Sequence, residues 1–347
     1  MKLKNMVESH FDYSELRKKL EQSGLLKPTP FYYVVIFFFY LNLLAILLWL
    51  INYFNKWYIT ALLAFPVSVV CMQFGYLGHD AGHRAISKKS LWNSFIGQIS
   101  LSLITGFSFT SWVKSHNEHH AYPNHEDLDP DIKDGTPFSF TEKKAMQRYG
   151  LIKLITRLQT LLLVPALFTF FFIKRYIYAR PAFKNKSYLD LVFLAMHYTL
   201  FFGLITYFIG IWQAILLYCI ISMLMGLFFG FSFLPNHLGM PILIGDSNIS
   251  YLKKQILTSR DVKGNFFLRF ITGSLNYQIE HHLFPTMSRK HLTKAKIIIK
   301  NFCYERGIPY KDDSLYAAWK EVFAYINRVS KKAGYEFYAI KAVNDMI

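Results

Sequence analysis

Histidine is the residue whose number and spacing in this sequence most clearly indicate chemistry. Seven of the 12 histidines fall in three short groups, with the patterns HxxxH, HxxHH and QxxHH. Residues at positions i, i+3 and i+4 lie on one face of a helix, so each group should project its imidazoles together. Three such faces, brought to one place, could hold two metal ions, and imidazole suits iron, copper and zinc. The groups are His79 and His83, then His116, His119 and His120, and then Gln278 with His281 and His282.

Polar residues in and beside these groups are candidates for orienting the rings. Metal-bound histidines usually donate their second ring N–H to a carboxylate, a carbonyl or water. A zinc protease of the HExxH type is not supported, because His125-Glu126 leads to Asp129 and not to a histidine. The candidates for such outer partners are Asp80, Glu118 and Glu280 inside the groups, together with Gln278 and His125.

Long runs without charged residues supply the elements that would position the histidines. The chain is 53% hydrophobic and only 18% charged, against about 25% charged in typical soluble domains. A helix needs about 20 apolar residues to cross a bilayer, and four runs satisfy this requirement. They predict an all-α integral membrane protein with four transmembrane helices in two hairpins, interfacial helices and a cytoplasmic helical cap that holds the metal site. The predicted spans are about 31–52, 57–79, 191–210 and 213–236.

Two other apolar runs are ambiguous by composition. Leu91–Val113 has a polar residue at about every second position, and Leu158–Ile173 is shorter and contains Pro165. If Leu91–Val113 crossed the bilayer, the first and second histidine groups would lie on opposite faces of the membrane. A shared metal site forbids that arrangement, so we expect both runs to be re-entrant or interfacial.

The charge distribution predicts the orientation of the chain. There are 39 Lys and Arg against 22 Asp and Glu, which gives a net charge of +17. The basic residues flank the apolar runs, which favours an anionic membrane face over nucleic acid. Because basic residues beside membrane spans are typical of the cytoplasmic side, we expect a cytoplasmic N-terminal segment (1–30), a membrane domain (31–300) and a cytoplasmic helical tail (301–347) with an amphipathic helix at 311–332.

The three cysteines form no CxxC motif, so neither a zinc-thiolate site nor a disulfide framework is indicated.

The histidine groups and their flanking residues resemble those of the membrane fatty-acid desaturases. The resemblance rests on Gly78 to His83, His119 to Asn124 with Asp129-Pro130-Asp131, and Gln278 to Pro285, and it covers residues 30 to 300. It implies a four-span helical fold whose cytoplasmic cap holds two iron ions, with O2 as co-substrate. The implied reaction introduces a cis double bond into a fatty-acyl chain, carried as acyl-lipid or acyl-CoA. Gln278 at the head of the third group resembles the front-end subgroup, which includes delta-5 and delta-6 desaturases.

His237 is the candidate for an eighth imidazole ligand. Seven histidines leave two irons short of ligands, and the amide of Gln278 would be a weak substitute. By the sidedness argument, His237 at the end of the fourth span lies at the same depth as His79. The family that the sequence resembles also takes a ligand from this helix. Asn236 beside it is a candidate for orienting the ring or a bound water.

The sequence also bears on the source of electrons and on alternative functions. Many front-end relatives carry a fused cytochrome b5 domain with an HPGG motif, which is absent here. We therefore expect a separate donor, either ferredoxin, flavodoxin or cytochrome b5, acting at the cytoplasmic face of a bacterial plasma membrane. The same scaffold could instead support a lipid hydroxylase or acetylenase. A membrane haem electron carrier and a metal transporter are alternatives of other classes, but His197 is the only histidine inside a predicted span, where a packed interior role is the simpler expectation.

Overall fold

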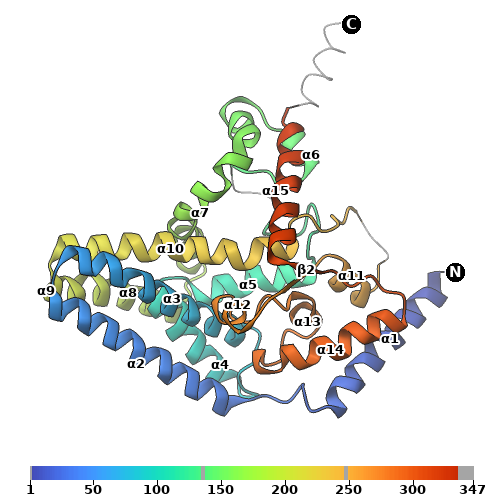
Figure 1. Cartoon of the computed structure of the whole chain (residues 1–347), viewed down its shortest axis with the longest axis horizontal. Helices are drawn as coiled ribbons and strands as arrows, with labels where there is room; N and C mark the ends of the chain where they lie inside the picture. The colour runs from blue at the N-terminus through green and yellow to red at the C-terminus, as the bar shows by residue number, and fades with distance from the viewer. Residues whose placement is uncertain (1, 134–136, 246–248, 335–347) are drawn as a thin grey trace, which may run out of the picture.

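The structure is a computed structural model that describes residues 2–133, 137–245 and 249–334 (Figure 1). Its described part is built almost entirely from helices, with one pair of short parallel strands. The elements are α1 (Lys2–Gln22), α2 (Pro30–Phe54), α3 (Trp57–Gly82), α4 (Ser90–Gly97), the π-helix η1 (Gln98–Thr105), α5 (Phe109–Ala121), α6 (Glu142–Met146), α7 (Gly150–Lys184), α8 (Tyr188–Tyr198), the π-helix η2 (Thr199–Ile205), α9 (Thr206–Ile209), α10 (Ile211–His237), α11 (Tyr251–Leu257), β1 (Asp261–Lys263), α12 (Phe266–Ile271), α13 (Gln278–Leu283), α14 (Arg289–Glu305), β2 (Asp312–Ser314) and α15 (Leu315–Lys331).

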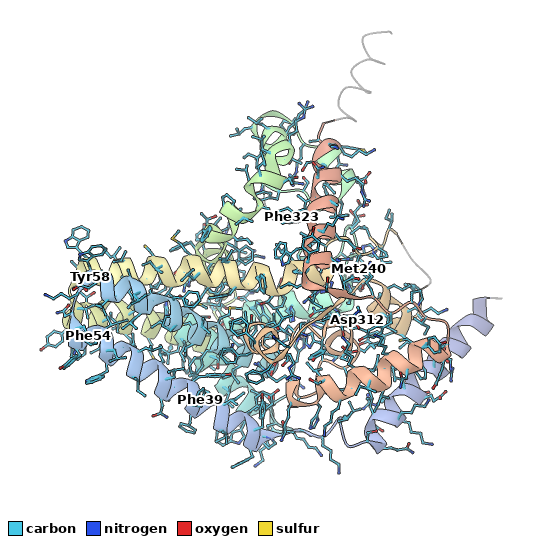
Figure 2. The ribbon with its side chains drawn as sticks, in the orientation of Figure 1. Phe39, Phe54, Tyr58, Met240, Asp312 and Phe323 are labelled. Atoms are coloured by element: carbon cyan, nitrogen blue, oxygen red, sulfur yellow. The ribbon has the colours of Figure 1, made fainter. Side chains whose placement is uncertain are left out.

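Five helical segments are long and apolar enough to cross a membrane. They are α2, α3, α7, the continuous segment α8–η2–α9, and α10. Four of them correspond to the predicted spans, and Figure 1 shows α2, α3 and α10 running side by side. Large apolar side chains cover their outer surface, as Phe39, Phe54 and Tyr58 show in Figure 2, each about half exposed. Such a surface fits an integral membrane protein.

The fifth segment, α7, corrects one sequence expectation. The run Leu158–Ile173, which was expected to be re-entrant or interfacial, is the middle of a helix of 35 residues that is long and apolar enough to cross a membrane. Both Pro165 and Pro181 are accommodated inside α7. The helix packs along α10, where Gly226 and Gly230 allow the close approach of Leu167. Four spans remain the prediction from sequence, and α7 is a fifth candidate.

The two predicted hairpins close at the end of the bundle away from the histidines. Asn55, with a left-handed φ of 43°, ends α2, and Gly210, with φ of 81°, separates α9 from α10. Gln213 joins the two turns, because its side chain accepts a hydrogen bond from Thr60 (2.9 Å) and donates one to Asn55 (2.8 Å). The turn predicted near residues 210–213 is therefore confirmed.

The segment from residue 90 to 121 folds back and does not form one long helix. Its first part, α4 and η1, ends at Gly106, which has φ of 74°. A side chain at this position would meet His197, because a Cβ atom would lie 2.7 Å from the His197 Nε2 atom. The second part, α5, begins after Ser108, whose hydroxyl caps the helix. The break brings the second histidine group beside the end of α3, and within the described residues this segment is not among the candidate spans.

His197 has the interior role that was expected for it. The ring is buried, with Nδ1 2.8 Å from the carbonyl oxygen of Leu103 and Nε2 3.3 Å from the hydroxyl of Tyr218. These hydrogen bonds account for both ring nitrogens.

The elements after α10 form a helical cap with its own cores. One core joins α1 to α11, α13 and α14 through residues such as Leu16, Leu283 and Ile299. Another lies under the amphipathic helix α15, which buries Val322 and Val329 against α7 and the end of α10. The predicted C-terminal helix is thus found at Leu315–Lys331, after the strand pair β1–β2. The last residues of the predicted tail, 335–347, lie outside the described residues, and the boundaries at 30 and 300 stay a prediction.

Candidate metal centre

Eight histidine side chains converge where α3, α5, α10 and α13 meet. Their ring nitrogens form two adjacent groups, and in each group the nitrogens lie within 4.8 Å of one another. Seven of the side chains are buried and His237 is partly buried. The structure thus brings together every histidine predicted from the sequence as a ligand. The first group is His79, His83, His116, His120 and His281, and the second is His119, His237 and His282.

The spacing of the nitrogens in the first group fits a bound metal ion. The Nε2 atom of His116 lies 3.2 Å from that of His79 and 3.2 Å from that of His120. The Nε2 atom of His281 lies 3.1 Å from that of His120. Two nitrogens bound at right angles about 2.1 Å from one metal are about 3.0 Å apart, so these separations are close to those of neighbouring ligands.

Unpartnered nitrogens give a second indication of the same kind. Among the described residues, the Nε2 atoms of His83 and His282 are buried and have no hydrogen-bond partner. A buried polar atom without a partner is unfavourable by about 1–3 kcal/mol. A metal ion would provide the missing partner, and a set made only of imidazoles suits iron, copper or zinc.

Burial keeps most of these rings in the form that binds metals. It lowers the pKa of His116, His120, His281 and His282 well below the usual range, and the neighbouring histidines add to the effect. A neutral imidazole has a free lone pair for a metal, whereas an imidazolium has none. In His119, burial alone would lower the pKa, but the carboxylate of Asp129 outweighs it and raises the pKa to about 9.

A carboxylate orients one ring in each group. Asp80 lies 3.2 Å from the Nδ1 atom of His79, as was expected from its place in the first histidine group. Asp129 lies 3.0 Å from the Nδ1 atom of His119 and is completely buried. In both pairs the carboxylate holds the outer nitrogen and directs Nε2 inward, which is the usual arrangement around metal-bound histidine. Asp129 was quoted in the resemblance but was not assigned this role.

Two further partners hold the second group, and neither was predicted from the sequence. The side-chain oxygen of Gln255, at the end of α11, lies 3.0 Å from the Nδ1 atom of His282. The backbone carbonyl of Thr258 lies 3.1 Å from the Nδ1 atom of His237. Gln255 also donates to the carbonyl of His120, which ties α11 to the second histidine helix. No local pattern of residues marks α11 as a partner of the histidines.

Asp80 is the centre of a buried network that joins three helices. Its carboxylate accepts a hydrogen bond of 2.7 Å from the hydroxyl of Tyr33 on α2 and pairs with the guanidinium of Arg289 on α14. Arg289 also donates to the carbonyl of Tyr76 on α3. Because a buried carboxylate is stable only when it is paired, this network fixes the orientation of His79 through the positions of α2 and α14.

Gln278 contacts His237 and is itself held by Asn236. The Gln278 Nε2 atom lies 2.9 Å from the His237 Nε2 atom, and its oxygen accepts a hydrogen bond of 3.1 Å from Asn236. The Nδ2 atom of Asn236 also lies 2.8 Å from the carbonyl oxygen of Ser232 and 3.0 Å from that of Leu275, so its two hydrogens are shared among three acceptors. Asn236 therefore orients Gln278 and, through it, the surroundings of His237, instead of contacting that ring directly.

Three of the expected outer partners do not contact a histidine ring. Glu118 is only partly buried, since a residue two positions after His116 lies on a different face of α5. Glu280 is completely buried, but its carboxylate accepts a hydrogen bond from the hydroxyl of Tyr310 (2.6 Å). His125 bonds to the carbonyl of Gly245 (3.1 Å) and fastens a loop. In all three cases, proximity in sequence does not place the side chain at the site.

A bundle of apolar helices that carries two adjacent, buried groups of histidine defines a membrane protein with a candidate dinuclear metal centre. Residues 55–314, well over half of the chain, match the sequence pattern of a known family, the fatty acid desaturases. The chain therefore belongs to the fatty acid desaturase family.

Three curated proteins illustrate the similarity. The chain is 28% identical to a fatty acid desaturase 2-like protein of Mus musculus over 90% of its own length and 65% of the mouse protein. It is 28% identical to an acyl-lipid (9-3)-desaturase of Physcomitrium patens, covering 93% of this chain and 63% of that protein. It is 26% identical to a delta(5) fatty acid desaturase of Caenorhabditis elegans, and the similarity covers 93% of this chain and 75% of the nematode protein. The chain thus spans slightly less than two thirds of the length of the mouse and moss relatives.

Proposed function

We propose that this protein is an O2-dependent fatty-acyl desaturase that introduces a cis double bond at a centre of two iron ions. The observation that carries the proposal is the convergence of eight histidines from three short motifs and from His237 in two adjacent buried groups. Membership of the desaturase family and the names of the three relatives support the same reaction. The names also favour the front-end subgroup, which acts between an existing double bond and the carboxyl end.

The two histidine groups would hold one iron each. The group of five offers enough imidazoles for a complete site, whereas the group of three needs a further ligand from solvent or from a neighbouring side chain. Bound iron would supply the activation of O2 that no side chain can provide. The protein's own contribution is to hold the rings. Asp80 and Asp129 retain the outer nitrogen of His79 and His119, and the burial of the site excludes water.

The overall reaction consumes O2, two electrons and two protons. Two hydrogens leave adjacent carbons of the acyl chain, one double bond forms, and two water molecules are released. The electrons would come from a redox protein, a ferredoxin, flavodoxin or cytochrome b5, that docks on the basic surface of the cap. The acyl chain would be presented as acyl-lipid or acyl-CoA. The location in a bacterial plasma membrane, with the site on the cytoplasmic face, remains a prediction, and the three relatives come from eukaryotes.

Product analysis in a living host tests the proposal. The full chain is expressed in cells that are fed defined C18 and C20 fatty acids with known double bonds, and new bonds are located by mass spectrometry. We expect a new cis bond on the carboxyl side of an existing one, and no new product from a His119→Ala variant produced at the same level, because His119 belongs to the group of only three imidazoles. A new bond on the methyl side of an existing one would support desaturation but contradict the assignment to the front-end subgroup. Hydroxylated or acetylenic products would show that the same centre performs the alternative reaction.

Iron analysis tests the cofactor separately. Protein purified in mild detergent should contain about two irons per chain, the number that a dinuclear site requires. One zinc per site with full activity, or the absorbance of haem, would contradict the proposal.

A further inference from the structure

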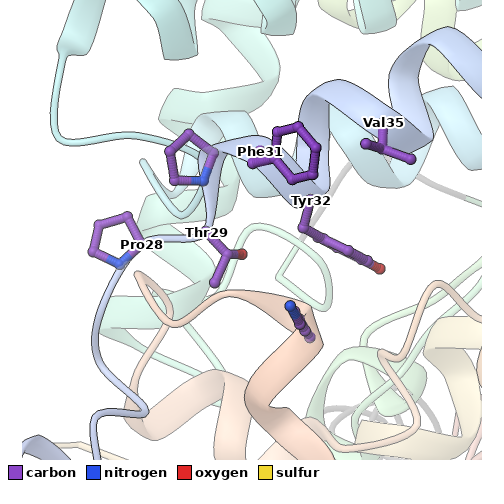
Figure 3. Close-up of a pocket in the computed structure, with 7 residues that line it drawn as sticks. Pro28, Thr29, Phe31, Tyr32 and Val35 are labelled. Carbon is purple, nitrogen blue, oxygen red and sulfur yellow. The ribbon is translucent and has the colours of Figure 1, made fainter.

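A pocket at the start of α2 is outside the metal centre and has a different chemistry. It has a volume of about 470 Å³ and lies between the first turn of α2 and the first turn of α14 (Figure 3). Its walls are apolar, and its one charged residue is Lys290. The lining residues are Pro28, Thr29, Pro30, Phe31, Tyr32, Val35 and Lys290.

The apolar wall of the pocket belongs to the surface that would face lipid. Phe31 is 80% exposed and Val35 is 50% exposed, both on the most apolar of the candidate spans. Figure 3 shows Phe31 and Val35 following each other along α2, away from Pro28. Large apolar side chains that are this exposed favour contact with acyl chains over water. The pocket therefore continues directly into the lipid-facing surface of the bundle.

The polar end of the pocket carries positive charge without a compensating carboxylate. Lys290 is exposed, and its ammonium lies 5.8 Å from the centre of the Tyr32 ring. Among the described residues, no ion pair joins Lys290 to an acidic side chain. Lys27, also exposed, immediately precedes the lining residue Pro28. Lysines directly beside a membrane span attract anionic headgroups.

Hydrogen bonds between the start of α2 and the start of α14 hold the floor of the pocket together. Thr29 and Ser288 share a hydrogen bond of 2.6 Å between their hydroxyl oxygens, which fastens the start of α2 to the start of α14. The backbone N–H of Arg289 donates to the hydroxyl of Tyr33 at 3.2 Å. These bonds hold the backbone on which Lys290 stands, while its exposed side chain remains free to adjust to a bound headgroup.

We infer that this pocket binds one anionic phospholipid of the surrounding bilayer. The phosphate lies against Lys290, and the first part of an acyl chain lies along Phe31 and Val35. A lipid satisfies both ends of the pocket, whereas a free inorganic anion would leave the apolar wall uncovered. This site is separate from the histidine groups, so the inference does not depend on the proposed reaction.

Lipid binding to the purified full-length protein tests the inference. Detergent-solubilised protein is titrated with phosphatidylglycerol or with phosphatidylcholine of the same acyl chains, and bound lipid is measured by native mass spectrometry. We expect phosphatidylglycerol to bind about fivefold more tightly, from one lysine beside an anionic headgroup. Lys290→Gln should remove this preference. Lys294→Gln, one turn further along α14 and outside the pocket, should preserve it.

Further variants and competitors distinguish a bound phospholipid from a bound inorganic anion or fatty acid. Phe31→Ala should weaken binding of both lipids and leave the preference between them intact. Equal binding of the two lipids by the wild-type protein would overturn the inference, as would an equal loss of preference in Lys290→Gln and Lys294→Gln. Displacement of the lipid by millimolar inorganic phosphate would indicate a simple anion site. Displacement by an equimolar free fatty acid would indicate a site for acyl carboxylates, and either result would also overturn it.

Discussion

The two histidine groups differ in how many rings they contain and in how the rings are held. The first has five imidazoles, and three of its closest contacts run between the Nε2 atoms of its own members. The second has three, and each has its outer nitrogen fixed by a different partner, namely Asp129, Thr258 or Gln255. One site is thus rich in ligands, and the other has few ligands that are individually oriented.

The difference extends to the elements that build each group. Four of the five rings in the first group come from α3 with its C-terminal cap and from α5, two segments that each contribute a pair with helical spacing. The second group takes one ring each from α5, α10 and α13, which are far apart in sequence. Surplus ligands make the first group tolerant of a single loss, whereas the second depends on the placement of every element.

The largest expected effect comes from removing one ring from each group. His237→Ala leaves two imidazoles in the second group, too few for a stable site, so iron content should fall from about two to about one per chain. His83→Ala leaves four imidazoles in the first group, and iron content should stay near two while turnover falls. Metal analysis of both variants beside their product yields measures this contrast. If His237→Ala keeps both irons and near-normal turnover, His237 is not a ligand.

The next effect concerns the carboxylate that holds His119. Asp129→Asn keeps the shape of the side chain but removes its charge, and it should lower iron affinity or activity about 10- to 100-fold, as is usual for partners of metal-bound histidine. Asp131→Asn is the matched control, because Asp131 is half exposed and its oxygen lies 3.5 Å from the same ring nitrogen. Iron retention during titration with a chelator compares the two. Equal effects of both variants would mean that net charge, and not the short contact, matters.

A smaller effect is expected for Gln255. Gln255→Ala removes the acceptor for His282 without removing a charge, and about a tenfold loss of iron affinity should follow. Gln255→Glu restores an acceptor oxygen at the same place and should recover most of the loss, although it gives up the hydrogen bond to the carbonyl of His120. The same chelator titration measures both variants. If Gln255→Glu folds normally but loses as much iron affinity as Gln255→Ala, Gln255 supports the position of α11 and not the orientation of the His282 ring.

The histidines could be predicted because their signal is local. Spacing of three and four residues places His116, His119 and His120 on one side of α5 without knowledge of the rest of the fold. The charge-free runs likewise predicted four apolar helices, and the predicted ends lie within a few residues of the ends in the structure. His237 needed a longer argument, which compared the depth of two spans, and the structure places it in the second group.

The outer partners could not be predicted because their contacts depend on the tertiary fold. Asp129 reaches His119 only because the chain reverses after α5, where Asn124 adopts a left-handed φ of 53° and donates its backbone N–H to the same carboxylate. Gln255 and Thr258 come from a segment more than a hundred residues away from α5. Glu118 and Glu280 were expected because they are neighbours in sequence, but adjacent residues of a helix point about 100° apart. The inclusion of Pro165 inside α7 had no local signal either.

The smallest expected effect concerns Gln278, where many desaturases have histidine. In the structure its oxygen is occupied by Asn236, and its N–H group faces His237. Turning the amide over would set its NH2 against that of Asn236, which is held by the carbonyls of Ser232 and Leu275. The amide oxygen is thus occupied by Asn236, and iron bound to the Nε2 atom of His237 would displace the Gln278 N–H group from that lone pair. We expect Gln278→Ala to retain about two irons per chain and to lose only a few-fold in turnover, because one hydrogen bond near the site contributes about 1 kcal/mol. Gln278→His adds a ligand where Gln278→Ala removes a side chain. A fourth imidazole in the second group should slow the loss of iron to a chelator. If Gln278→Ala loses one iron as His237→Ala should, the glutamine is a ligand after all, and the second group is less poor in ligands than its three rings suggest.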